Sequence, residues 1–185
     1  MTRHTRRVHA PAGQKNHSIV LPDADLDLAV KGIINAAFGS AGERCMACSV
    51  VVAVGSVAEQ LVERLVEQAA ALQMGDGLQE GVFLGPVIRE PHKARTLGYI
   101  EKGVEQGAVL RLDGREREEV QGEGCFIGPT IFDHVTQDMV IWQDEIFAPV
   151  LQIVRVDSLD EAINVANASE FANGGCIYTD SAKAI

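Results

Sequence analysis

Hydrophobic residues recur along the chain with two alternating periods, which predict strands and helices in turn. Residues 18–21 read as a short strand, and residues 49–54 form a nearly unbroken β-branched run, "SVVVAV", typical of a strand buried on both faces. Between them, the pattern predicts an amphipathic helix that begins near Asp25 and ends at Gly39. Its apolar side is expected to carry Leu28, Ile33, Ile34 and Ala37.

A second helix is expected directly after the β-branched run. The segment "SVAEQLVERLVEQAAAL" has helical period, and Ser56 is a suitable N-cap for it. The side chains expected to point inward are Leu61, Leu65 and Leu72.

The rest of the chain continues the alternation of strand and helix. A helix is predicted over residues 90–108, followed by a strand at 108–113 and an exposed polar turn at 114–124. A strand at 151–156, a helix from Ser158 and a strand at 174–179 complete another such unit. Because strands and helices alternate in this way, the fold class is predicted to be α/β, a mainly parallel sheet flanked by helices.

The composition fits one soluble domain, since 46% of the 185 residues are hydrophobic and 23% are charged. A net charge of −10 argues against binding to nucleic acid or to an anionic membrane surface, which needs concentrated positive charge. No apolar stretch approaches the roughly 20 residues that span a bilayer, and the first residues lack the apolar segment of a secretory signal. We therefore expect a cytoplasmic location, or the mitochondrial matrix in a eukaryote.

The segment "AFGSAGERCMACSVVVAV" contains the candidate nucleophile, Cys45. A thiol attacks as its thiolate, which nearby positive charge stabilises, and Arg44 is the adjacent residue. Gly39 and Gly42 allow a substrate to approach the backbone closely. Their place between a helix and a strand end is one where parallel α/β folds bind ligands.

Other interpretations of Cys45 and Cys48 stay open at this point. Both could be small core residues, because cysteine is among the most frequently buried residue types. A redox pair is less favoured, because the two cysteines lead from a loop into a strand rather than beginning a helix. A zinc site lacks a second pair of ligands, so no metal is predicted.

The remaining histidines and cysteines suggest no chemistry of their own. His17, His92 and His134 are expected in turns or at helix starts, with no spacing that unites them. Cys125 and Cys176 are expected in strands as small packing residues, and Cys48 at a strand entry.

Several segments together resemble the aldehyde dehydrogenase superfamily. "FGSAGERCMACSVVVAVGSVAEQLVERL" resembles its catalytic-cysteine segment, and the form "G-x-R-C-M-A" is similar to the coenzyme A-acylating methylmalonate-semialdehyde dehydrogenase branch. "LGPVIREPHKARTLGYIEKGVEQGA" and "WQDEIFAPVLQIVRVDSLDEAINVAN" extend the resemblance. It covers residues 13–185, whereas residues 1–12 match poorly. The resemblance implies a truncated catalytic domain that lacks most of the NAD-binding domain and the C-terminal oligomerisation segment.

The resemblance also implies a reaction. Cys45 would attack the aldehyde carbon of (methyl)malonate semialdehyde, hydride would pass to NAD, and the thioester would be transferred to coenzyme A. Loss of carbon dioxide would give propionyl-CoA or acetyl-CoA, a step of valine catabolism. Arg44 would bind the substrate carboxylate, while Glu145 would accept from the nicotinamide ribose and Phe147 would pack beside it.

One departure from the family pattern favours transfer to coenzyme A. Where hydrolytic members carry a glutamate in "E-L-G-G-K", this chain reads "P-A-G-Q-K", with Pro11 at the matching place. A general base that would activate water is absent there. The alternatives are a hydrolytic aldehyde dehydrogenase and a catalytically inert, subunit-binding module. The resemblance further implies that the parent enzyme is a homo-oligomer, a dimer or tetramer.

Overall fold

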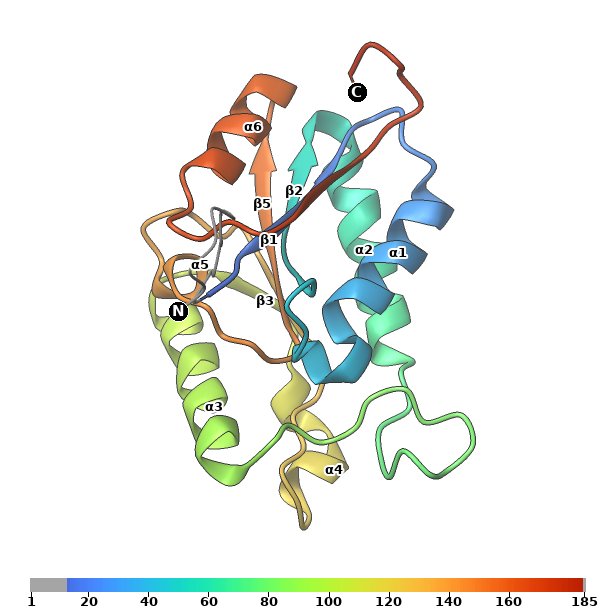
Figure 1. The fold of residues 1–185 in the computed structure, drawn as a ribbon, viewed down its shortest axis with the longest axis vertical. Helices are drawn as coiled ribbons and strands as arrows, with labels where there is room; N and C mark the ends of the chain where they lie inside the picture. Colours follow the sequence, from blue (N-terminus) through green and yellow to red (C-terminus); the bar gives the residue numbers. More distant parts are fainter. Residues whose placement is uncertain (1–12, 185) are drawn as a thin grey trace, which may run out of the picture.

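A computed structural model describes residues 13–184, which form a six-stranded sheet between two layers of helices (Figure 1). The strand order is β3-β4-β5-β2-β1-β6, and every neighbouring pair is parallel except β3 with β4. The predicted α/β class with a mainly parallel sheet is thereby confirmed. The strands are β1 (Asn16–Val20), β2 (Cys48–Val54), β3 (Val109–Leu112), β4 (Thr130–Asp133), β5 (Val150–Val156) and β6 (Gly175–Tyr178).

Two groups of helices cover opposite faces of the sheet. Helices α1 (Leu26–Phe38) and α2 (Ala58–Ala70) lie together on one face, and α3 (Glu90–Glu105), α5 (Val140–Gln143) and α6 (Leu159–Asn167) lie on the other (Figure 1). The short α4 (Glu118–Gln121) contributes Val120 to the first face. No helix within residues 13–184 has both the length and the apolar character needed to cross a bilayer.

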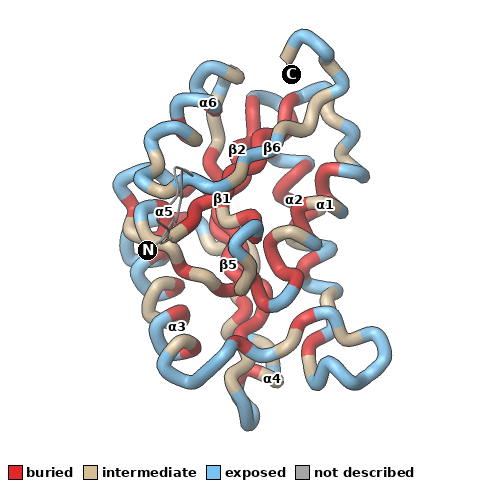
Figure 2. The backbone as a smooth tube through the Cα atoms, in the orientation of Figure 1, coloured by how far each residue is buried: buried red, intermediate tan, exposed pale blue. Residues whose placement is uncertain are grey.

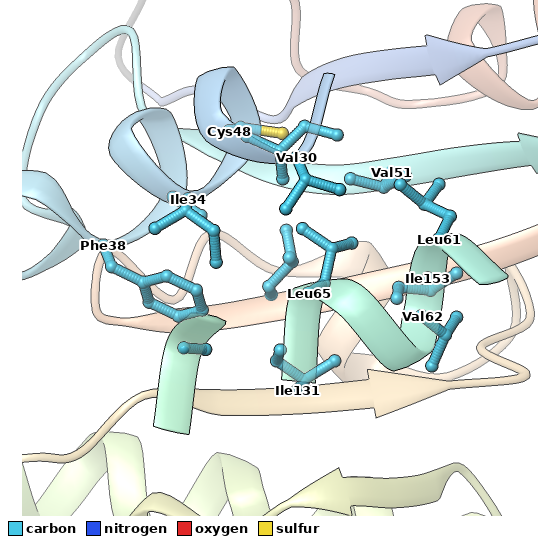
Figure 3. Packing of buried hydrophobic residues seen from close by; sticks show 14 of the residues in the cluster. Val30, Ile34, Phe38, Cys48, Val51, Leu61, Val62, Leu65, Ile131 and Ile153 are labelled. Atoms are coloured by element: carbon cyan, nitrogen blue, oxygen red, sulfur yellow. The ribbon is translucent and has the colours of Figure 1, made fainter. Parts of the chain in front are cut away.

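Strand β2 shows why its sequence is a continuous apolar run. Val51 and Ala53 point into the core beneath α1 and α2, whereas Val50 and Val52 point into the core beneath α6. All four are fully buried, because β2 lies between β1 and β5 with helices on both sides (Figure 2). Figure 3 shows the first of these cores, with Leu61 and Leu65 of α2 facing Val51 and Ile153.

Helix α1 confirms both predicted ends but corrects its apolar face. The Asp25 carboxylate accepts hydrogen bonds from two backbone N–H groups of the first turn, and Gly39 caps the C-terminal end. Leu28 is 63% exposed, so the prediction that it points inward is wrong. The buried stripe runs through Val30, Ile33, Ile34 and Ala37, and Leu28 lies about 140° around the helix from Ile33.

Four further local predictions are corrected. Ser56 lies in the 3₁₀ turn Gly55–Val57, so it is not the N-cap of α2. Residues 114–124 are not simply an exposed turn, since they form the 3₁₀ turn Gly114–Glu116 and α4. His17 lies buried within β1 rather than in a turn, and Cys125 lies in a loop rather than in a strand.

Candidate active site

The loop that carries Cys45 has an unusual backbone. Ser40, Ala41 and Gly42 follow α1 with φ values of 54°, 55° and 70°, in the left-handed region. A side chain at Gly42 would place its Cβ 2.4 Å from the carbonyl oxygen of Ala148, so only glycine allows this approach. The turn therefore brings the Cys45 loop against the segment before β5. Cys45 itself is an exposed free thiol.

The loops around Cys45 meet at the edge of the sheet where its strands begin. Cys45 precedes β2, Glu145 and Phe147 precede β5, and Asn173 precedes β6. Because these strands are parallel, their amino ends lie on the same side of the sheet, and these side chains gather there. The cavity therefore lies at the amino ends of the strands and not outside their carboxyl ends, where parallel α/β folds commonly bind ligands. Here the segments that enter the strands build the cavity.

A cavity of about 450 Å³ brings three of the four predicted site residues together. Cys45, Glu145 and Phe147 all line it. Phe147 has a φ of 57°, so a bulky residue is held in a left-handed conformation at the cavity wall. The other lining residues are Gly13, Gln14, His92, Arg95 and Asn173.

The Glu145 side chain is held at the start of β1. One of its carboxylate oxygens accepts a hydrogen bond from the Gln14 backbone N–H at 3.2 Å. A Cβ at Gly13 would lie 3.4 Å from the other carboxylate oxygen, so this backbone lies directly against the side chain. Glu145 keeps acceptor capacity toward the cavity, and such a carboxylate suits a ribose diol.

Helix α3 fixes the backbone of Glu145 and of the residues that follow it. Arg95 donates from Nη2 to the carbonyl oxygen of Glu145 at 2.8 Å. His92 Nε2 lies 2.7 Å from the carbonyl oxygen of Phe147, within hydrogen-bonding distance. His92 also lies 3.4 Å from a carboxylate oxygen of Glu43, in the Cys45 loop. The two side chains are three residues apart and therefore share one face of the helix.

Lys15 is the most deeply buried charged residue near the cavity. Its Nζ donates to the carbonyl oxygens of Ile141 and Asp144, at 2.6 Å and 2.5 Å, and the residue is 2% exposed. Burial lowers the pKa of Lys15 to about 7, although the negative charges of Asp144 and Glu145 oppose the shift. An amine that loses its proton near neutrality keeps two N–H donors, enough for both carbonyls.

Arg44 does not line the cavity with Cys45. Its Nη2 donates to the carbonyl oxygens of Asn35, by a short hydrogen bond, and of Ala36, at 3.2 Å. A Cβ at Gly39 would lie 2.7 Å from that nitrogen, so the guanidinium lies directly over the glycine that ends α1. The structure thus places Arg44 on the carbonyl end of α1, where a cation is favourable.

Cys48 confirms the prediction of a packing residue at a strand entry. It is the first residue of β2, is 5% exposed, and belongs to the core beneath α1 and α2. Burial raises the pKa of its thiol to about 12, so it stays protonated near neutral pH. A redox pair with Cys45 is disfavoured, because Cys48 cannot readily form a thiolate.

The described part of the chain contains no group of three or more histidine, cysteine or acidic side chains arranged to hold a metal ion. Pro11, the predicted departure from the hydrolytic pattern, lies outside the described residues.

Five cavity neighbours were not predicted as site residues. Their positions depend on contacts between distant segments, and only the three-residue spacing of His92 and Arg95 gave a signal in the sequence. These residues are Gly13, Gln14, His92, Arg95 and Asn173.

The fold and the site together describe a parallel-sheet domain with an exposed cysteine and a glutamate lining one cavity at the amino ends of its strands. The aldehyde dehydrogenase family model matches residues 1–185, and the chain belongs to this family. The match includes residues 1–12, for which we expected little resemblance.

Curated relatives are similar over nearly the whole chain. It is 69% identical over 182 residues to malonate-semialdehyde dehydrogenase 3 of Geobacillus kaustophilus (strain HTA426), covering 98% of the chain and 38% of that relative. It is 67% identical over 184 residues to malonate-semialdehyde dehydrogenase 2 of Bacillus thuringiensis (strain Al Hakam), again covering 38% of the relative. The chain thus spans little more than a third of their length.

Solved structures have the same fold. A crystal structure of methylmalonate-semialdehyde dehydrogenase from Oceanimonas doudoroffii is 45% identical with a TM-score of 0.90, covering 94% of this chain and 36% of that protein. The putative methylmalonate-semialdehyde dehydrogenase from Sinorhizobium meliloti 1021, solved in complex with NAD, is 44% identical with the same TM-score and coverage.

Proposed function

We propose that the protein containing this chain is an NAD-dependent, coenzyme A-acylating dehydrogenase of malonate semialdehyde or methylmalonate semialdehyde. The observation that carries the proposal is that Cys45 and Glu145 line one cavity in a chain 69% identical to a malonate-semialdehyde dehydrogenase. The proposal also includes a homo-oligomeric, cytoplasmic enzyme, which gel filtration and cell fractionation can check.

Cys45 is the proposed nucleophile. Its sulfur forms a bond to the aldehyde carbon, and the carbonyl oxygen takes up a proton to give a thiohemiacetal. NAD, when bound, supplies the acceptor for the hydride that leaves this carbon. Loss of this hydride and of the hydroxyl proton leaves an acyl group on the sulfur of Cys45. The acyl group also loses its carboxylate as carbon dioxide, and a proton takes its place on the carbon. The thiol of coenzyme A then displaces the Cys45 sulfur, which takes up the proton that this thiol loses and returns as a thiol.

Glu145 and Phe147 are proposed to orient the nicotinamide ribose beside Cys45. The Glu145 carboxylate has free acceptor capacity toward the cavity, which suits the two ribose hydroxyl groups. Phe147 offers an apolar surface on the same wall. His92 and Arg95 hold the backbone of this segment, so Glu145 is ordered before a ligand binds.

Arg44 is proposed to bind the substrate carboxylate. A guanidinium can hold a carboxylate through two parallel hydrogen bonds while the neighbouring sulfur reaches the aldehyde. In the present arrangement, its Nη2 is used by the carbonyl oxygens of Asn35 and Ala36. The carboxylate contact therefore requires this side chain to leave the end of α1.

Cys45→Ser in the full-length protein tests the proposed nucleophile. We expect NADH formation from malonate semialdehyde to fall by at least about 10³-fold, because a hydroxyl is a far weaker nucleophile than a thiolate at neutral pH. Cys125→Ser is the matched control, since Cys125 lies in a loop away from the cavity and should keep the wild-type rate. Undiminished activity of Cys45→Ser would refute the proposed nucleophile.

Product analysis separates the proposed reaction from its two alternatives. We expect acetyl-CoA from malonate semialdehyde in the presence of NAD and coenzyme A, because Pro11 replaces the glutamate that would activate water. Free acid formed at the same rate without coenzyme A would instead identify a hydrolytic aldehyde dehydrogenase. Absence of NADH together with rapid alkylation of Cys45 by iodoacetamide would identify an inert module with a formed site.

A further inference from the structure

The carbonyl oxygen of Cys45 accepts hydrogen bonds from two asparagine side chains. Asn16 donates to it from Nδ2 at 2.9 Å, and Asn173 donates from Nδ2 at 2.5 Å. Asn16 is the first residue of β1, whereas Asn173 lies in the segment that enters β6. Side chains from two distant segments therefore hold the peptide group of the proposed nucleophile, and they use both lone pairs of its oxygen.

The side chain of Asn16 links three segments of the site. Besides Cys45, its Nδ2 donates to the carbonyl oxygen of Ala47 at 2.8 Å, and its Oδ1 accepts from the backbone N–H of Gly174 at 2.8 Å. Asn16 is 5% exposed, so water does not compete strongly for these groups. Both of its amide hydrogens are used, which fixes the orientation of the amide.

Gly174 allows the two loops to approach each other. A Cβ at this position would lie 2.7 Å from the terminal carbon of Met46 and 3.3 Å from Oδ1 of Asn16. Asn173 also lies close to Met46, with Nδ2 at 3.3 Å from its sulfur. The segment before β6 thus lies directly on the residues that follow the nucleophile.

We propose that Asn173, together with Asn16, is a positioning residue for Cys45. The two amides hold the Cys45 carbonyl and leave its thiol free at the cavity, so that the sulfur keeps one position during attack and acyl transfer. Neither side-chain amide forms a hydrogen bond with the sulfur of Cys45, so the two asparagines act through the backbone of Cys45. The inference rests on the proposed function only in taking Cys45 as the nucleophile.

Hydrogen exchange in the full-length protein tests the proposal without reference to any substrate. Asn173→Ala removes one donor at an exposed side chain, and Asn164→Ala on α6 removes an exposed asparagine that lies outside the cavity. We expect about five-fold faster exchange in residues 43–47 for Asn173→Ala only, because loss of one hydrogen bond eases local opening. The Ala47 N–H donates to the backbone carbonyl oxygen of Arg44 at 2.9 Å, and its exchange rate reports this opening. Unchanged exchange would overturn the proposal.

Kinetics and cysteine labelling separate positioning from a general role in folding. For Asn173→Ala we expect kcat to fall by about ten-fold or more with KM within about two-fold, since small displacements of a reacting group are costly. The pH midpoint of Cys45 alkylation should stay unchanged, because the amides do not contact the thiol. Reaction of iodoacetamide with buried Cys48, or an unchanged kcat, would overturn the proposal.

Asn16→Ala is a second variant with a stronger expected effect. It removes hydrogen bonds to Cys45, Ala47 and Gly174 together, so residues 43–47 and 173–175 should both exchange faster than in Asn173→Ala. If the wild-type protein forms no NADH from malonate semialdehyde, the proposed function fails, yet the exchange results still decide the role of the two asparagines. Exchange in Asn16→Ala that is slower than or equal to exchange in Asn173→Ala would contradict the proposal that both asparagines position Cys45.

Discussion

Arg44 and Cys45 are adjacent residues whose surroundings differ. Cys45 faces the cavity, whereas the Arg44 guanidinium lies on the last carbonyl groups of α1. The sequence indicates a cation beside a nucleophile, but it does not indicate which way the cation turns. The role proposed for Arg44 in binding a carboxylate and the contacts that the structure shows at the end of α1 predict different kinetics.

Arg44→Met should weaken binding of substrates that carry a carboxylate. We expect KM for malonate semialdehyde to rise by about 10-fold to 100-fold, because a charge-assisted bidentate contact is lost, while KM for propionaldehyde stays unchanged. Steady-state NADH formation with both aldehydes measures this. Arg64→Met, which removes an arginine paired at the surface with Asp27, is the control. An equal loss with both aldehydes would leave Arg44 only its role at the end of α1.

Lys15 makes the stability of the chain depend on pH. Its pKa is lowered by burial from 10.5 to about 7, so above pH 7 the unfolded state binds more protons than the folded state. The free energy of unfolding should therefore rise with pH, by up to roughly 1 kcal/mol per pH unit. The useful window is pH 7 to 9, since above pH 9 the raised pKa of Cys48 acts in the opposite direction.

Lys15→Met isolates this contribution. Urea unfolding measured between pH 7 and 9 should show a rise in stability for the wild type and a flatter profile for Lys15→Met, whose side chain does not titrate. The variant also loses two hydrogen bonds, so its profile should be compared in slope and not in absolute stability. Lys31→Met, on the exposed side of α1, is the control and should retain the wild-type slope.

At the scale of elements, patterns within one segment were predictable, whereas contacts between segments were not. The ends of α1 follow from Asp25 and Gly39, and the β-branched run follows from burial on both faces of β2. Ser56 fails as an N-cap because the chain makes a 3₁₀ turn before α2. Strand β4 was not predicted from the sequence. It is only four residues long, which is too short to show a clear alternation, and it is stabilised by pairing with β3 and β5.

The same distinction applies to the site. Cys45, Glu145 and Phe147 follow from motifs and lie on the cavity, whereas Lys15, Asn16 and Asn173 contribute only through tertiary contacts. Their partners are up to 129 positions away in the chain for Lys15 and 128 for Asn173. No local pattern in a sequence identifies such a hydrogen bond.

A network of charges joins β3, β4 and β5 to α2. Arg155 contacts both carboxylate oxygens of Asp133, at 2.9 Å and 2.6 Å, and Arg111 lies 3.4 Å from one of them. Both arginines also reach Glu59 on α2, at 2.8 Å and 3.2 Å. The side chain of Asp133 is fully buried, whereas that of Glu59 is 56% exposed. Burial should decide what each carboxylate contributes.

Asp133→Asn should therefore destabilise the chain far more than Glu59→Gln. We expect a loss of about 3 kcal/mol for Asp133→Asn, because the arginines lose their buried counter-charge, and a much smaller loss for the exposed Glu59→Gln. Both substitutions replace a carboxylate by an amide of similar size, so each controls for the other in urea unfolding. Similar losses from the two variants would show that burial does not set the contribution of this network.

At the scale of the whole molecule, one sheet forms the centre of both cores. Cys48 belongs to the core beneath α1 and α2, and Trp142 belongs to the core beneath α3, α5 and α6. Trp142 is the only tryptophan in the sequence, is 5% exposed, and packs edge-on against His17 of β1 with ring centroids 6.1 Å apart. The two residues report separately on opposite faces of the same sheet.

Both faces should unfold together, because β1, β2 and β5 contribute side chains to both cores. In a urea titration, the fluorescence change of Trp142 and the alkylation of Cys48 by iodoacetamide should have the same midpoint. Exposed Cys176 provides the internal control, since it should react at every urea concentration. If Cys48 reacted at a lower urea concentration than the fluorescence midpoint, the layer of α1 and α2 would open while the opposite face stays folded. The Cys45 loop, which follows α1, would then be displaced while the cavity wall at Glu145 is still folded. The site would therefore be lost at a lower urea concentration than the rest of the fold.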